Sequence, residues 1–139
     1  MNTEELLDCP YRVIDFLPKQ VPADSAGQYF AVEKYLRTGL RGEIQNRKFM
    51  LILKLMCYQE LTLFLPDTEE TKLRPAPEEL GKSMAERSVC LILKDAMITS
   101  DPDDAYMTLY HADEELLSLI GSLAGSEGFF VRDPEGPAV

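Results

Sequence analysis

The stretch from Ser100 to Leu123, SDPDDAYMTLYHADEELLSLIGSL, constrains the fold more than any other part of this chain. Three aspartates and a proline at 101–104 favour a turn, because both residue types suit turn positions. Residues 106–111 alternate between two faces, which is typical of a β-strand. Asp113 then precedes apolar residues at helical spacing and suits a helix N-cap. We therefore predict a hairpin turn, a strand and a capped helix, in that order.

Strand and helix patterns also alternate along the rest of the chain. The stretch 40–59 has helical spacing and few β-branched residues, which favours a helix, although 47–58 could instead form a buried strand. Proline and glycine end most of the other segments. The remaining expected elements are strands at 11–18, 60–66, 88–101 and 128–134, and helices at 26–39 and 77–86.

These elements predict a single α+β domain over residues 1–139, in the order β-α-α-β-α-β-β-α-β. We expect a mixed β-sheet with the helices packed mainly on one face. The last β-α-β unit would be a parallel pair with a right-handed crossover. We interpret 67–77 as a mobile acidic, proline-containing loop and 133–139 as a frayed tail.

Charge is distributed unevenly along the sequence. The chain carries a net charge of −10, which opposes general binding to nucleic-acid phosphates. Residues 34–54 are the exception, with six basic residues and one acid. This basic segment could receive an acidic partner or a phosphate. Alternatively, it is a solvated face that attracts the acidic loops of the protein itself.

Two tyrosines of the predicted hairpin share one strand face with Thr108. They form either a half-exposed sheet face or a partner surface, since tyrosine is enriched at protein interfaces. Together with the basic segment they make up the partner surface that the sequence suggests, namely Arg37, Arg41, Arg47, Lys48, Lys54, Tyr106 and Tyr110.

Asp101, Asp103, Asp104 and His111 form an alternative candidate site. The aspartates do not follow the calcium-loop pattern, although a looser magnesium or calcium site is conceivable. A single histidine cannot make a multi-histidine metal site, and it would need a nucleophile or carboxylate within reach for catalysis. A solvated turn and a strand-end histidine explain the same residues. We therefore assign no catalytic, cofactor-binding or metal-binding residue.

The cysteines and the apolar runs bear on the compartment. Three cysteines without a C-x-x-C pair suit a reducing cytoplasm. The start MNTEELLDCPYR lacks the apolar run of a secretory signal, and FMLIL is too short to span a membrane. We therefore expect a cytoplasmic protein with no membrane association.

The functional expectation is a small binding or regulatory protein without catalysis. It would act through a macromolecular partner, either another protein or a second copy of itself, and would need no cofactor. The first alternative is a small enzyme or a metal- or ligand-binding domain that uses the aspartate cluster and His111. The second is an acidic inhibitor that mimics nucleic acid, which would need its acidic residues aligned on one face.

Overall fold

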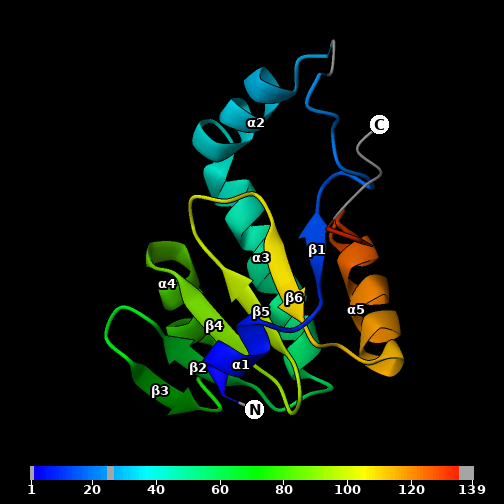
Figure 1. The fold of residues 1–139 in the computed structure, drawn as a ribbon. Helices are drawn as coiled ribbons and strands as arrows, with labels where there is room; N and C mark the ends of the chain where they lie inside the picture. Colours follow the sequence, from blue (N-terminus) through cyan, green and yellow to red (C-terminus); the bar gives the residue numbers. More distant parts are fainter. Residues whose placement is uncertain (1, 25–26, 135–139) are drawn as a thin grey trace.

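The computed structural model describes residues 2–24 and 27–134. Its centre is a seven-stranded sheet with the strand order β3-β2-β4-β5-β6-β1-β7, in which every pair of neighbouring strands is antiparallel (Figure 1). The strands are β1 (Tyr11–Asp15), β2 (Thr62–Leu65), β3 (Glu70–Leu73), β4 (Val89–Ile92), β5 (Met97–Ser100), β6 (Met107–Tyr110) and β7 (Phe130–Arg132).

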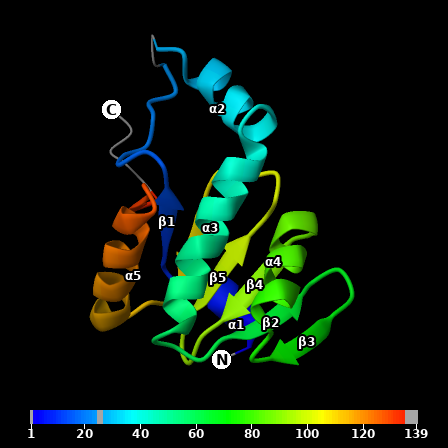
Figure 2. The same cartoon turned by 180° about the vertical axis from the view of Figure 1, so that it is seen from behind.

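The helices cover the two faces of this sheet unequally. Three of them, α3, α4 and α5, lie on one face (Figure 2), whereas the short α1 packs on the other face. The cyan helix α2 projects from the end of α3, beyond the sheet (Figures 1 and 2). This arrangement confirms the predicted single α+β domain. The helices are α1 (Thr3–Leu7), α2 (Tyr29–Thr38), α3 (Arg41–Met56), α4 (Pro77–Glu86) and α5 (Glu114–Ser126).

The main hydrophobic core lies between the sheet and the three helices on its covered face. Strand β6 shows how the sequence alternation produces it, because Met107 and Leu109 are buried while Thr108 is only partly covered. Burying such an apolar side chain contributes about 1.5–3 kcal/mol. On the opposite face a smaller cluster joins Leu6 of α1 to Cys90 and Met97.

The predicted strand at 88–101 is wrong, because two strands occupy this range. β4 ends at Ile92, and the chain reverses before β5 begins at Met97. A hydrogen bond from the Leu93 amide to the Ala96 carbonyl, 2.9 Å long, closes the turn. Asp95 lies inside this turn, where aspartate is favoured.

Other differences concern the ends and connections of the sheet. Residues 70–73 form β3, so the interpretation of all of 67–77 as a loop is wrong. The expected parallel pair does not form, because β1 lies between β6 and β7 and pairs antiparallel with both. The stretch 40–59 is helical as far as Met56. Of the expected frayed tail, residues 135–139 lie outside the described part of the chain.

A candidate binding groove on the uncovered sheet face

A groove of about 420 Å³ lies on the side of the sheet opposite α3 and runs along β1, from Leu7 of α1 to Tyr29 at the start of α2. Strands β1, β6 and β7 form its floor, and the start of α2 contributes to its wall. We call it the tyrosine groove, and its defining residues are Tyr11, Tyr29, Tyr106 and Tyr110 together with Asp15, Glu33, Asp104 and Arg132.

Strand register brings the floor of the groove together. Tyr11 and Tyr110 are cross-strand partners in the β1–β6 pair, and Val13 pairs with Thr108 next to them. The two tyrosine rings are tilted at 44° with their centroids 5.6 Å apart, a favourable aromatic geometry. Because side chains alternate across a strand, these residues face away from the core formed by Leu109 and its neighbours. Two sequence-distant segments therefore present one aromatic surface.

Charged side chains line the rest of the groove. Arg132 on β7 donates from Nη2 to Oδ2 of Asp15 on β1 over 3.0 Å. Both side chains of this pair are mostly buried, with 15% and 13% of their surface exposed. Glu33 on α2 forms an ion pair with Arg37, one helical turn further on, at 2.7 Å. Three carboxylates therefore line the groove with one guanidinium, and that guanidinium is already paired.

Burial and nearby carboxylates both act on the tyrosines of the groove. Burial raises the pKa of Tyr106, and the nearby carboxylates of Asp104 and Asp101 raise it further. Burial and then Asp15 and Glu33 raise the pKa of Tyr29 in the same way. The phenol groups therefore remain neutral donors and acceptors at physiological pH.

Helix α2 exposes apolar side chains next to the groove. None of the residues of α2 is buried. Phe30, Val32 and Tyr35 keep 79%, 48% and 60% of their surface exposed. An added Cβ at Gly39 would lie 2.9 Å from the ring of Tyr35, so glycine allows the close turn into α3. Within the described residues, no other segment therefore covers these apolar side chains of α2.

Side chains of α3 hold the aspartate loop, residues 101–104, in place. Buried Lys48 donates from Nζ to the carbonyl oxygens of Asp101 and Asp104, at 2.9 and 3.1 Å. Gln45 donates to the carbonyls of Pro102 and Asp104. Arg41 pairs with the Asp103 carboxylate at 3.0 Å. The basic segment and the aspartate loop therefore contact each other.

The carboxylates of this loop have different surroundings. Asp101 accepts hydrogen bonds from the Ser88 hydroxyl and from the Asp103 amide, which lower its pKa. Partial burial and the charge of Asp101 raise the pKa of Asp104, whose side chain faces the groove. Within the described residues, no group of three or more histidine, cysteine or acidic side chains is arranged to hold a metal ion.

The remaining residues of the predicted basic surface also contact the protein itself. Arg37 pairs with Glu33, as described above. Arg47 pairs with Glu43 at 3.3 Å and donates to the carbonyl of Glu127. Lys54 donates to the Glu127 carboxylate at 2.5 Å. These basic side chains thus serve several separate contacts, and only the tyrosines of the predicted partner surface line the groove.

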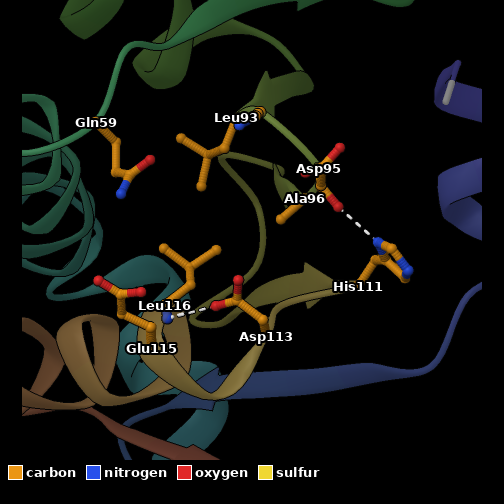
Figure 3. Close-up of a pocket in the computed structure, with 9 residues that line it drawn as sticks. Gln59, Leu93, Asp95, Ala96, His111, Asp113, Glu115 and Leu116 are labelled. Atoms are coloured by element: carbon orange, nitrogen blue, oxygen red, sulfur yellow. Dashed lines mark hydrogen bonds between the residues drawn. The ribbon is translucent and has the colours of Figure 1, made fainter.

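His111 lies at the far end of β6 from the aspartate loop. Strand β6 has four residues, so it separates the two by at least about 13 Å. The Nδ1 atom of His111 is 2.6 Å from the carbonyl oxygen of Asp95, and its amide donates to Pro10 (Figure 3). His111 has a positive φ of 61°, a conformation in which histidine is several-fold enriched among non-glycine residues. The structure therefore does not bring His111 and the aspartates into one cleft.

A small depression of about 170 Å³ surrounds this histidine. Figure 3 shows Asp113 at its edge, where its carboxylate accepts from the Leu116 amide at 2.8 Å and caps α5. Gln59 and Glu115 approach from the opposite side of the depression (Figure 3). The polar groups of His111 and Asp113 thus hold a turn and a helix end in place.

Sequence reasoning identified only part of the tyrosine groove. Tyr106 and Tyr110 were expected to share a surface, whereas Tyr11, Tyr29 and Asp15 were not connected to them. The available signal was the alternation Tyr11-x-Val13-x-Asp15, which places three residues on one face of a strand. Which strand would lie beside it depends on the non-local β1–β6 pairing.

Comparisons with known proteins give no further assignment. A scan of protein-family models, a search of curated proteins and a search of solved structures each returned no match. In the part of the chain that the structure describes, no helix combines the length and apolar character needed to cross a lipid bilayer.

Proposed function

We propose that this protein is a small cytoplasmic binding or regulatory protein that acts without catalysis, by holding a macromolecular partner in the tyrosine groove. The observation that carries the proposal is the convergence of four tyrosines, from β1, β6, the segment before β6 and the start of α2, on one groove at the sheet face opposite α3. Tyrosine is enriched at protein interfaces, because its ring supplies apolar area and its hydroxyl tolerates water.

The position of α2 supports a partner larger than a small molecule. Phe30, Val32 and Tyr35 are exposed apolar side chains on the same helix whose Tyr29 and Glu33 line the groove. Exposed apolar and aromatic side chains among polar residues are typical of protein interaction sites. The partner is therefore a macromolecule that contacts both the groove and α2, either another protein or a second copy of this chain.

The surroundings of the polar candidates support the absence of catalysis in this proposal. Asp101 and Asp103 hold their own loop, and His111 and Asp113 fix a turn and a helix end. A general acid or base instead needs an open path to a substrate atom. The proposed cytoplasmic location is supported by Cys9, Cys57 and Cys90, which are all free thiols.

A comparison of three proteins tests the proposal. The tagged wild type, a Tyr11→Ala/Tyr106→Ala double variant and a Tyr58→Ala control are each used to capture partners from the native cell. Tyr58 is a matched control because it is 68% exposed and does not line the groove. Both groove tyrosines are also substantially exposed, so the double variant should remain folded, which circular dichroism verifies.

We expect a set of proteins that the wild type and the control retain and the double variant loses at least tenfold. Such a loss corresponds to at least about 1.4 kcal/mol, within the range of two interface tyrosines. Sedimentation at increasing protein concentration tests whether the partner is a second copy of this chain. In that case the double variant should self-associate more weakly than the wild type. Identical captured sets and identical sedimentation for all three proteins would contradict the proposal.

A further inference from the structure

The tyrosine groove combines aromatic faces with carboxylates, and this combination selects a class of occupant. An anion would be repelled by Asp15, Glu33 and Asp104, which line the groove together with a single guanidinium. A purely apolar group would remove water from these carboxylates, including Asp104, which forms no ion pair among the described residues, and would give nothing in return, at a free-energy cost. A cation gains from both components, because tyrosine faces attract cations and carboxylates pair with them.

Among the described carboxylates that line the groove, Asp104 is the one without an ion pair. Asp15 is paired with Arg132 and Glu33 with Arg37. Across the described ranges, the Asp104 carboxylate makes no ion pair, although Lys48 lies behind it at its backbone carbonyl. Burial and then the neighbouring Asp101 raise the pKa of Asp104, and the charge of Lys48 opposes them only in part. A positive charge arriving from the groove would stabilise the ionised form of Asp104.

The groove already accommodates one guanidinium, which shows the geometry that a second could use. Arg132 lies within the groove, donates from Nε and Nη2 to Asp15, and is mostly buried. The charge of Arg132 also acts on Tyr29, since it lowers the pKa of that phenol against the larger effect of burial. The Asp15 carboxylate is therefore already paired with a side chain of the protein itself, whereas the Asp104 carboxylate, which also lines the groove, makes no ion pair in the described residues.

We infer that the Asp104 end of the tyrosine groove binds an arginine side chain presented by the partner protein, with its guanidinium beside the Asp104 carboxylate and against the Tyr106 ring. This inference rests on the proposed function and names the chemistry of the partner. Arginine is favoured over lysine because a planar guanidinium stacks on aromatic rings and pairs with a carboxylate in a fixed geometry.

Amide chemical shifts measured by NMR test the inference directly. The probe is N-acetyl-arginine-N-methylamide, and its matched control is the citrulline analogue, which has nearly the same shape but no charge. We expect saturable shifts in the millimolar range at amides of β1, β6 and residues 104–106. The citrulline analogue should bind at least about threefold more weakly, which corresponds to one exposed cation–aromatic contact.

Two variants of the same loop provide the second arm of the experiment. Asp104→Asn should reduce arginine binding to the level of the citrulline analogue. Asp103→Asn removes a carboxylate of the same loop that pairs with Arg41 and does not line the groove, and it should leave the binding unchanged. The Asp104 variant should stay folded, because asparagine has nearly the same shape and the Asp104 carboxylate forms no ion pair among the described residues; circular dichroism verifies this. No saturable shifts, equal shifts from both analogues, or unchanged binding to the Asp104 variant would each overturn the inference.

Capture from cells separates this inference from the proposed function. If the Tyr11/Tyr106 double variant loses the partner and Asp104→Asn keeps it, the groove binds a partner without using an arginine. The inference then fails and the proposed function stands. If both variants retain everything that the wild type captures, both fail. Loss of the same partner by both variants supports both.

Discussion

Replacing Lys48 with methionine is expected to change how the stability of the protein depends on pH. The ammonium group is fully buried and donates to the carbonyls of Asp101 and Asp104. Methionine retains most of the length and the apolar stem but carries no charge. Each carbonyl keeps a second donor, from the Asp104 amide in one case and Gln45 in the other. The substitution therefore leaves neither acceptor unpaired.

The magnitude follows from the pKa of this lysine. Burial is the largest effect and lowers the pKa from 10.5 to about 8, while attraction to Asp104 and Asp101 opposes it. Between these pH values the unfolded chain binds more protons than the folded protein, so the contribution of Lys48 to stability rises with pH. The full difference corresponds to about 3 kcal/mol, of which about 2 kcal/mol is reached by pH 9.5.

Urea unfolding of both proteins at pH 7 and at about pH 9.5 measures this effect. The free energy of unfolding of the wild type minus that of Lys48→Met should increase by about 2 kcal/mol over this interval. At pH 7 the variant should be as stable as the wild type within about 1 kcal/mol, because it avoids burying a charge. Burial raises the pKa of Cys90 and several tyrosines, but these groups are common to both proteins. If the difference in free energy of unfolding between the two proteins were the same at both pH values, the pKa of Lys48 would not be lowered in the folded protein.

Three substitutions around α5 give further predictions, each measured by urea unfolding at pH 7. Asp113→Ala removes the acceptor of the Leu116 amide and should cost about 1 kcal/mol, and a loss below about 0.3 kcal/mol would show that the cap is unimportant. Gly128→Ala should cost at least about 1 kcal/mol, because φ is +82° and the new Cβ would lie 3.1 Å from Arg47; an unchanged stability would argue against that backbone conformation. Gly121→Ala meets nothing within 4 Å inside the helix and should gain up to about 1 kcal/mol, whereas destabilisation would indicate a contact that the structure does not contain.

Local signals made several elements predictable. Pro77 and two acids start α4, and Asp113 caps α5, where the sequence pattern predicts each of them. The break at Lys94 and Asp95 was harder to see, because the residues on both sides are strongly apolar and read as one strand. Two short buried strands joined by a tight turn have nearly the same composition as one long strand.

The order of strands in the sheet depends on contacts between distant segments. The pairing of Tyr11 with Tyr110 joins residues almost a hundred positions apart, and no local pattern specifies it. The same pairing places β1 between β6 and β7 and so replaces the expected parallel pair. The tyrosine groove is a product of this register, which is why only its β6 side could be anticipated.

The position of Lys48 in the sequence pattern agrees with its burial, although the sequence analysis did not predict it. Lys48 follows Ile44 by four positions and precedes Leu51 and Ile52 by three and four, so it falls within the apolar stripe of α3. Its spacing from Arg41 suggested a basic face instead. The carbonyl groups of the aspartate loop decide between these two environments, and they belong to a segment more than fifty residues away.

Photo-crosslinking within the native cell tests whether the tyrosine groove holds a macromolecular partner. A benzophenone amino acid is placed at position 106, inside the tyrosine groove, or at position 58, on an exposed surface outside it. We expect a discrete cross-linked species from position 106 and none of the same mass from position 58. No adduct at position 106, or the same adducts from both positions, would contradict the claim that this groove holds a macromolecular partner.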